Sequence, residues 1–237
     1  MTTHRTVKKT NQLIVGVIAS PADLRFAVAM RQPPDLFEIR LDCLVDVLDQ
    51  VEKKLSILSA RGWTRRGELA PIIITARDPR EGGANNLSVS ERRELLLRFL
   101  SHAKYIDVEL RSARALKPLL AHSRKQNVRR ILSFHDFKST PSPRSLRAKA
   151  ALANAHGADI FKVATRTDTP AELARLINFV MDRDFDLAVS AMGIGKLGAI
   201  SRLLLASGGS VLNYASLHRS QVEGQLPIEL LRSALLH

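Results

Sequence analysis

The stretch DIFKVATRTDTPAELARLINFVMD, residues 159–182, shows the unit from which the chain is built. Its first part, Asp159–Thr165, is an apolar run typical of a buried β-strand. Thr169 and Pro170 then form the signature of a helix start, in which proline takes the first helical position. A helical stretch follows to residue 182. We therefore predict a strand followed by a helix.

The same order repeats along the rest of the chain. We expect eight strands, over Leu13–Ser20, Phe37–Asp42, Pro71–Arg77, Tyr105–Leu110, Arg129–Phe137, Asp159–Thr165, Asp186–Met192 and Ser210–Ser216. We expect helices near residues 22–31, 46–60, 90–102 (capped at Ser90), 112–124, 144–156, 169–182, 198–207 and 227–236. The strand starts run from 13 to 210, so the intervals average about 28 residues, which suits a βα repeat.

Eight such units in 237 residues favour a single (β/α)8 TIM barrel, for which ~250 residues are typical. No low-complexity or proline-rich stretch interrupts the series. We therefore expect a basic N-terminal tail over residues 1–10 and one catalytic barrel domain over residues 11–237. A doubly wound open sheet is the alternative, because eight βα units can also form a flat sheet.

The composition excludes several classes of protein. No stretch approaches the ~20 apolar residues of a membrane helix, and no apolar segment follows the polar start MTTHRTVKK as in a secretory signal. The single cysteine, Cys43, excludes an internal disulfide framework and a cysteine-based zinc site. We expect a cytoplasmic protein that does not contact a membrane.

The net charge of +13 suggests an anionic ligand. Nucleic-acid-binding domains usually concentrate their positive charge and add aromatic side chains for stacking. Here the arginines are scattered and aromatic residues make up only 5% of the chain. We therefore expect no nucleic-acid partner, although a non-catalytic nucleic-acid-binding protein stays the more distant alternative.

Polar and apolar side chains alternate in five consecutive predicted strands. In a barrel, one face of each strand packs on helices and the other points inward. This alternation directs inward the side chains of Glu38, Arg40, Asp42, Thr75, Arg77, Asp107, Glu109, Ser133, His135 and Lys162. An internal ion-pair network would explain most of them, because buried charges are costly unless paired. It leaves His135 and Lys162 unexplained, so we predict an active site at the carboxyl ends of the strands.

Lys162 lies in an otherwise apolar strand, Asp159–Thr165. Desolvation and nearby cations such as Arg40 or Arg77 would disfavour its charged form. A neutral amine can form an imine with a ketone or aldehyde. His135, on the adjacent strand, can then remove a proton next to the former carbonyl carbon. The alternative is a lysine whose amine reaches solvent.

The segment MGIGKLG, residues 192–198, contains a GxGxxG pattern between a strand and a helix. Dinucleotide binding is disfavoured, because the pattern follows the seventh strand and no acidic residue ends the next strand. Glycine-rich turns at this place in a barrel more often bind an anion with helix N-terminal amides. Arg202, one turn into the helix, could add a fork for a carboxylate or phosphate.

Five short motifs occur in order: EIR at 38–40, TAR followed by EGG at 75–83, SFHDF at 133–137, FKVAT at 161–165, and MG…SR ending at Arg202. Together they resemble type I 3-dehydroquinate dehydratase, a family of (β/α)8-barrel lyases of the shikimate pathway that form a Schiff base. The resemblance runs from about residue 13 to residue 230. It implies 3-dehydroquinate as the substrate, no metal or other cofactor, and a homodimer.

The resemblance also implies roles for individual residues. Lys162 matches the imine-forming lysine, His135 matches the general acid and base, and Glu81 matches the acid that orients this histidine. The implied substrate-binding residues are Glu38, Arg40 and Arg77 for the ring hydroxyls, Arg202 for the carboxylate, and Gln225 on a loop that closes over the site.

The chain departs from the family pattern in this closing loop. Family members often have a serine four residues before the glutamine, whereas this chain has Gln221 there and Ser220 one position earlier. Either Ser220 or Gln221 is expected to make the contact. A lysine-imine aldolase or transaldolase acting on sugar phosphates remains the nearer alternative function.

Overall fold

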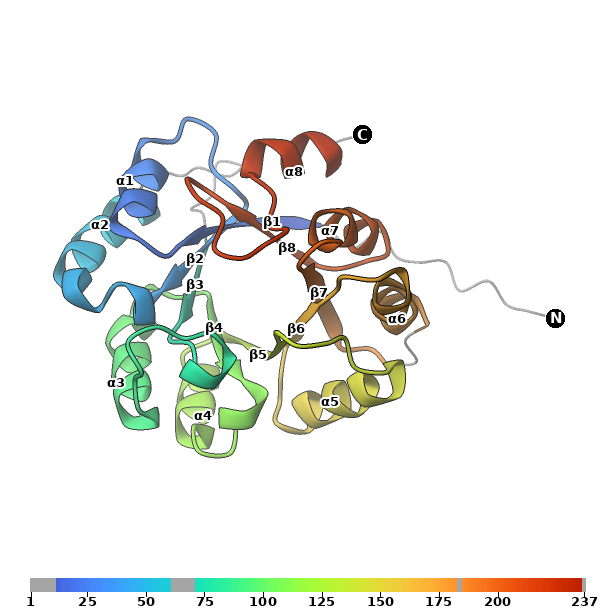
Figure 1. Ribbon diagram of the computed structural model, residues 1–237. Coiled ribbons are helices and arrows are strands. Elements are labelled where there is room, and N and C mark those ends of the chain that lie inside the picture. Colours follow the sequence, from blue (N-terminus) through green and yellow to red (C-terminus); the bar gives the residue numbers. More distant parts are fainter. Residues whose placement is uncertain (1–11, 61–70, 183–184, 236–237) are drawn as a thin grey trace.

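The computed structural model describes residues 12–60, 71–182 and 185–235, and these form a ring of eight parallel strands surrounded by helices (Figure 1). The strands are β1 (Leu13–Ile18), β2 (Leu36–Arg40), β3 (Ile72–Thr75), β4 (Tyr105–Glu109), β5 (Arg129–Asp136), β6 (Ile160–Arg166), β7 (Ala188–Ile194) and β8 (Leu212–Ser216). The helices are α1 (Pro21–Ala29), α2 (Leu48–Ala60), α3 (Val89–Phe99), α4 (Lys117–Lys125), α5 (Pro143–Ala155), α6 (Pro170–Met181), α7 (Gly198–Ser207) and α8 (Ile228–Leu235).

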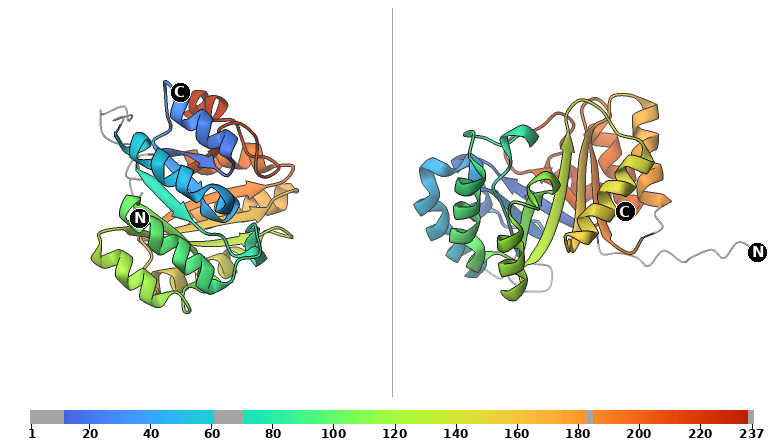
Figure 2. Two further views of the ribbon diagram at one scale, coloured as in Figure 1. Left: turned by 90° about the vertical axis from the view of Figure 1, so that its left-hand side faces the viewer. Right: turned by 90° about the horizontal axis from the view of Figure 1, so that it is seen from below.

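The strand order confirms the barrel. It runs β7-β6-β5-β4-β3-β2-β1-β8, with β1 paired to both β2 and β8, so β7 and β8 are the two ends of the sheet, and bonds between these ends distinguish a barrel from a flat sheet. Between β7 and β8 the backbone N–H of Val211 donates to the carbonyl of Val189 at 2.9 Å, and Ser190 Oγ donates to the carbonyl of Leu212 at 2.7 Å. These bonds join the two ends of the sheet, and the two further views show helices on the outside of the strands (Figure 2).

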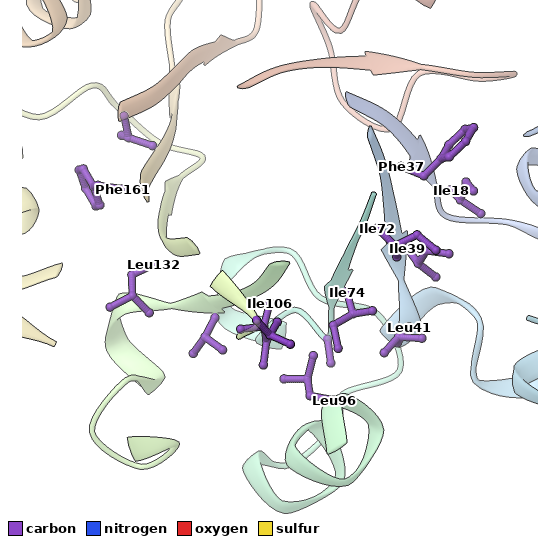
Figure 3. Close-up of a cluster of buried hydrophobic side chains, with 14 of the residues drawn as sticks. Ile18, Phe37, Ile39, Leu41, Ile72, Ile74, Leu96, Ile106, Leu132 and Phe161 are labelled. Carbon is purple, nitrogen blue, oxygen red and sulfur yellow. The ribbon is translucent and has the colours of Figure 1, made fainter. Parts of the chain in front are cut away.

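Two apolar clusters confirm the predicted alternation in the strands. The larger cluster lies between strands and helices, and Figure 3 shows part of it, including Phe37, Ile39, Ile72, Ile74, Ile106, Leu132 and Phe161. The smaller cluster fills the barrel interior and includes Val15, Ile73, Tyr105, Ile131 and Tyr214. Each large side chain buried in this way contributes about 1.5–3 kcal/mol. The apolar layers therefore support the strands while the polar side chains gather at their carboxyl ends.

Reciprocal capping boxes define two of the helix starts. Thr169 Oγ1 accepts from the backbone N–H of Glu172, whose carboxylate accepts in return, so the predicted start of α6 is confirmed. The prediction of a cap at Ser90 is wrong. Ser88 caps α3 because it forms the same reciprocal pair with Glu91.

Strands β1 to β5 all end earlier than predicted, and the early endings of β2 and β3 shape the site. The chain turns into short 3₁₀ helices at Leu41–Cys43 after β2 and at Pro79–Glu81 after β3. Asp42 therefore lies on a turn at the end of the barrel rather than on the predicted strand, and Glu81 lies on the second of these turns; both are buried. The start of α4 also differs from the prediction, because a 3₁₀ helix at Leu110–Ser112 precedes it.

The expected basic tail, residues 1–10, and the expected start of the barrel domain at residue 11 lie outside the described residues. In the part of the chain that is described, no helix has the length and apolar character needed to cross a membrane.

Candidate active site

Lys162 lies on β6 with its side chain inside the barrel and only 3% exposed. Its Nζ donates to Glu38 Oε1 at 3.1 Å and to Asp107 Oδ2 at 2.9 Å. Glu38 also accepts from Thr75 Oγ1 at 2.8 Å. The amine is therefore held across the barrel by carboxylates from β2 and β4, and it does not reach out to solvent.

Carboxylates are the immediate neighbours of Lys162, and the expected cations lie beyond them. Arg40 pairs instead with Asp42, whose Oδ2 lies 2.8 Å from Arg40 Nη2. Arg77 is the nearer cation, because its Nη2 lies 3.0 Å from Asp107 Oδ2, the same oxygen that accepts from Lys162 Nζ. Burial by itself would raise the pKa of the Asp107 carboxyl, but the charges of Arg77 and Lys162 lower it well below its usual range. The group next to the amine is thus a firmly ionised carboxylate.

The internal ion-pair network is present and extends from the barrel to helix α3. Besides Asp107, Arg77 binds Glu109 Oε1 at 3.0 Å and Ser133 Oγ at 2.6 Å. Glu109 Oε2 also accepts from Arg92 Nη1 of α3 at 2.7 Å. Because these charges are buried and mutually paired, the network fixes the carboxylates that hold Lys162.

His135 and Glu81 form a second unit at the carboxyl end of β5. Glu81 Oε2 accepts from the backbone N–H of His135 at 2.9 Å and lies 3.0 Å from its Nδ1. The His135 side chain is 9% exposed, and burial together with the charges of Arg77 and Lys162 lowers its pKa well below 6.5. The imidazole is therefore neutral at neutral pH and able to accept a proton.

His135 lies close to Lys162 in the sheet. Ser133 of β5 is the register partner of Lys162, and His135 is two residues further toward the carboxyl end of the strand, opposite Ala164. Successive inward-facing residues on a strand are two positions apart. The imidazole therefore lies one inward position nearer the barrel mouth than the amine.

Arg202 of α7 is a buried cation without an acidic partner in the described part of the chain. It is 3% exposed, and its guanidinium donates only to the backbone carbonyls of Gly224 and Tyr214, both at 3.1 Å. Burial lowers its pKa to about 10, so it remains charged at neutral pH. An unpaired buried cation is costly, and an anionic ligand group would complete its ion pairing.

The loop after β8 lies beside Arg202, and its last part contains Gln225, which is 8% exposed. Figure 1 shows this red segment between β8 and α8 in front of β1 and β8. Gln225 Oε1 accepts from the backbone N–H of Gln221 at 2.7 Å, and Ser220 Oγ donates to the carbonyl of Gln225 at 3.1 Å. Ser220 and Gln221 are both exposed, and both help to hold Gln225.

The glycines of MGIGKLG serve close packing of backbone rather than a nucleotide. A Cβ at Gly198 would lie 2.9 Å from Gly224 Cα, so the glycine lets the loop after β8 approach α7. Two backbone amides of the turn before α7 are taken up by acceptors within the protein. The N–H of Gly195 donates to the carbonyl of Glu223, and that of Lys196 donates to Asp168 Oδ1.

The remaining predicted residue, Arg40, lies at the barrel mouth. Its side chain is 15% exposed, and its Nη2 also donates to the carbonyl of Gly82 at 3.1 Å. Sequence reasoning missed Arg92 and Tyr214. Arg92 lies on a helix, where nothing in the sequence marks a buried arginine, whereas the alternation in β8 could have placed Tyr214 inside the barrel. Within the described ranges no group of three or more His, Cys, Asp or Glu side chains is arranged to hold a metal ion.

A parallel eight-stranded barrel with a buried lysine, a neutral histidine and ionised carboxylates at the carboxyl ends of its strands is the architecture of a (β/α)8-barrel enzyme. Residues 20–237 match the model of one family, type I 3-dehydroquinase. The chain therefore belongs to the type I 3-dehydroquinase family.

Curated relatives and a solved structure agree with this assignment. A 3-dehydroquinate dehydratase from Shouchella clausii (strain KSM-K16) is 35% identical over 218 residues, which cover 88% of this chain and 82% of that protein. One from Geobacillus sp. (strain WCH70) is 34% identical over 212 residues, covering 86% and 80%. The crystal structure of 3-dehydroquinate dehydratase from Geobacillus kaustophilus HTA426 has a TM-score of 0.83 and 28% identity, covering 96% of this chain and 91% of that chain.

The pH profile should reveal the ionisation of Glu81. Burial, reinforced by the charge of Glu109, raises the pKa of Glu81 to about 7. Ionised Glu81 accepts Nδ1–H of His135 and leaves Nε2 free as a base, whereas protonated Glu81 would donate to Nδ1 and block Nε2 with the proton. We expect kcat/KM to fall about tenfold per pH unit below pH 7.

Glu81→Gln should remove this acidic limb and lower the rate at its maximum. The pKa of Glu81 is higher in the folded protein than in the unfolded chain. Its neutral form therefore stabilises the fold at pH values below the unfolded-state pKa, and this contribution is lost as pH rises through 7. The variant should therefore gain about 3 kcal/mol of unfolding free energy over the parent protein above pH 7. An unchanged acidic limb in the variant would show that another group controls it.

Proposed function

We propose that this protein removes water from 3-dehydroquinate to form 3-dehydroshikimate, a step of the shikimate pathway toward the aromatic amino acids. The observation that carries the proposal is the arrangement of Lys162 between two carboxylates, with the neutral His135, bound by Glu81, one inward position nearer the mouth. Family membership and the relatives named 3-dehydroquinate dehydratase support the substrate. The enzyme is a hydro-lyase.

The first step is formation of a Schiff base on Lys162. The Nζ lone pair attacks the C3 ketone of the substrate after the amine has released its extra proton, while the carboxylates of Glu38 and Asp107 hold the nitrogen in place. The carbonyl oxygen takes up two protons and leaves as water. The nitrogen keeps a positive charge as a protonated imine, which acidifies the C2 proton.

His135 then performs the elimination. Its Nε2 removes the C2 proton, the electron pair moves toward the iminium nitrogen, and the C1 hydroxyl leaves with a proton returned by His135. Hydrolysis of the imine releases the product and regenerates the amine. Glu81 keeps the imidazole in the tautomer that this step needs. We propose that no metal or other cofactor takes part.

The other residues bind the substrate. The carboxylate of 3-dehydroquinate pairs with Arg202, a buried cation that has no acidic partner among the described residues. Glu38, Arg40 and Arg77 bind the ring hydroxyls. Of the two arginines, Arg40 lies at the barrel mouth. Much of the hydrogen-bonding capacity of Arg77 is taken up by Asp107, Glu109 and Ser133. Gln225 closes over the ligand, and either Ser220 or Gln221 makes the second contact from this loop.

Arg202→Ala should raise KM for 3-dehydroquinate about 100-fold with a smaller change in kcat, because a charged hydrogen-bonding pair in a buried site is lost. Competitive inhibition separates this role from a general loss of structure. Quinate should bind the parent protein much more tightly than quinate methyl ester, and the variant should bind both alike. An unchanged preference for the free carboxylate would contradict the assignment.

We also propose that the protein works as a homodimer in the cytoplasm, with no nucleic-acid or membrane partner. The family resemblance supports the dimer, and the scattered arginines with few aromatic residues support the absence of nucleic acid. Sedimentation of the protein alone, at low and high salt, tests the homodimer. Sedimentation with duplex DNA under the same conditions tests the absence of nucleic-acid binding.

Turnover of 3-dehydroquinate tests the function itself. Product formation can be followed by the ultraviolet absorbance of the conjugated enone in 3-dehydroshikimate. We expect turnover of 3-dehydroquinate and none of sugar phosphates. Cleavage of a sugar phosphate without dehydration of 3-dehydroquinate would show an aldolase on the same barrel instead.

A further inference from the structure

Tyr214 of β8 lies against the amine of Lys162 on the side that the carboxylates leave open. Lys162 Nζ is 3.9 Å from the centroid of the Tyr214 ring. The tyrosine is 3% exposed and belongs to the apolar cluster inside the barrel. The amine is thus bounded by Glu38, Asp107 and the face of this ring.

The hydroxyl of Tyr214 has no hydrogen-bond partner among the described residues. Buried hydroxyl groups are normally hydrogen-bonded. Because the Tyr214 hydroxyl makes no such bond to a described residue, the hydroxyl does not explain why a tyrosine occupies this position. The side chain of Tyr214 contacts a charged group through its ring face, whereas its backbone carbonyl accepts from Arg202.

The other tyrosine of the chain, Tyr105, has a different environment. It lies at the start of β4, its ring centroid is 5.4 Å from Cζ of Arg129, and its hydroxyl accepts from Arg129 Nη1 at 3.2 Å. It is also buried in the barrel interior, but at the amino end of the strands and away from Lys162. Tyr105 is therefore a matched control of the same residue type in the same cluster.

We propose that Tyr214 is a positioning residue whose ring face holds the Lys162 nitrogen and stabilises positive charge on it. The inference rests on the proposed imine. When that imine forms, the nitrogen lone pair makes the C–N bond, the carbonyl oxygen leaves as water, and the nitrogen again carries positive charge. A π-face attracts a cation most strongly where water is excluded, as here. The ring thus favours the iminium over the neutral carbinolamine that precedes it.

The test varies the electrons of the ring while keeping its shape. Phe, 4-fluoro-Phe, 3,5-difluoro-Phe and 3,4,5-trifluoro-Phe are placed at position 214, and kcat, KM and the fraction of borohydride-trapped adduct are measured with 3-dehydroquinate. Each fluorine weakens the negative face of the ring. We expect kcat and the trapped fraction to fall stepwise, by about tenfold from Phe to trifluoro-Phe, with little change in KM.

Two pairs of variants complete the design. Tyr214→Leu should lose about tenfold or more in kcat, and Tyr214→Phe should restore most of that loss because it keeps the ring. Tyr105→Leu and Tyr105→Phe should leave kcat unchanged, since that ring does not face the amine. If Tyr214→Leu fails to fold, the fluorinated series still decides the question.

The outcomes separate this inference from the function on which it rests. An adduct in the parent protein with no trend across the fluorinated series overturns the role of the ring alone. A large loss in Tyr214→Phe overturns it too, because the hydroxyl would then be the active part. Absence of any adduct in the parent protein overturns the imine and this inference together.

Discussion

Replacing Lys162 with alanine should lower kcat for 3-dehydroquinate by about 10⁵-fold or more, the scale seen when a covalent nucleophile is removed. The variant cannot form the imine, so the C2 proton is no longer acidified. It also leaves Glu38 and Asp107 without the ammonium between them, and removal of one partner of a buried ion pair costs about 3–5 kcal/mol of stability. Turnover and thermal unfolding should therefore be measured on the same preparation.

Lys162→Arg separates loss of chemistry from loss of structure. It keeps a cation between the carboxylates but cannot form an imine, so it should fold and remain inactive. Lys149→Ala is the matched lysine control, because Lys149 on α5 also lies over a ring, 4.1 Å from the centroid of Phe134, and contributes nothing to the site. Turnover near the parent value in Lys162→Arg would remove the imine mechanism.

Replacing His135 with alanine should lower kcat about 10³-fold, the usual contribution of a positioned acid or base. Imine formation requires the amine of Lys162 and not the imidazole, so the trapped adduct should persist although the elimination is slow. Loss of the imidazole also leaves the buried Glu81 carboxyl without its ring partner. The expected signature is therefore an enzyme that accumulates imine and releases little product.

His122→Ala, on the exposed surface of α4, is the matched control and should behave as the parent protein. Single-turnover measurements with and without borohydride distinguish the two steps. If His135→Ala turned over at the parent rate, another group would have to move the C2 proton. If it lost the adduct as well, His135 would be needed for imine formation.

The fold and the inner polar side chains could be predicted from the sequence because both depend on local periodicity. Strand residues alternate between two faces, so apolar Phe37 and Ile39 on the helix side already place Glu38 inside the barrel. The spacing of strands and helices then favours a closed barrel. The five motifs add the individual roles, which stay proposals until the variants are measured.

What could not be predicted depends on contacts between distant parts of the chain. The sequence places Lys162 and Arg77 on one face, but only the closed barrel shows that Asp107 lies between them. Arg92 enters the network from α3, and periodicity on a helix does not distinguish it from a surface arginine. The predicted cap of α3 is wrong because both Ser88 and Ser90 precede acidic residues. Only Ser88 has a glutamate three positions later, as the reciprocal capping pair requires.

The most direct test of the central claim is reduction with borohydride in the presence of 3-dehydroquinate, followed by intact mass measurement and peptide mapping. The mechanism predicts one ligand-sized adduct on the peptide that contains Lys162, absent without substrate and absent in Lys162→Arg. Formation of 3-dehydroshikimate at full rate with no adduct on that peptide would contradict it.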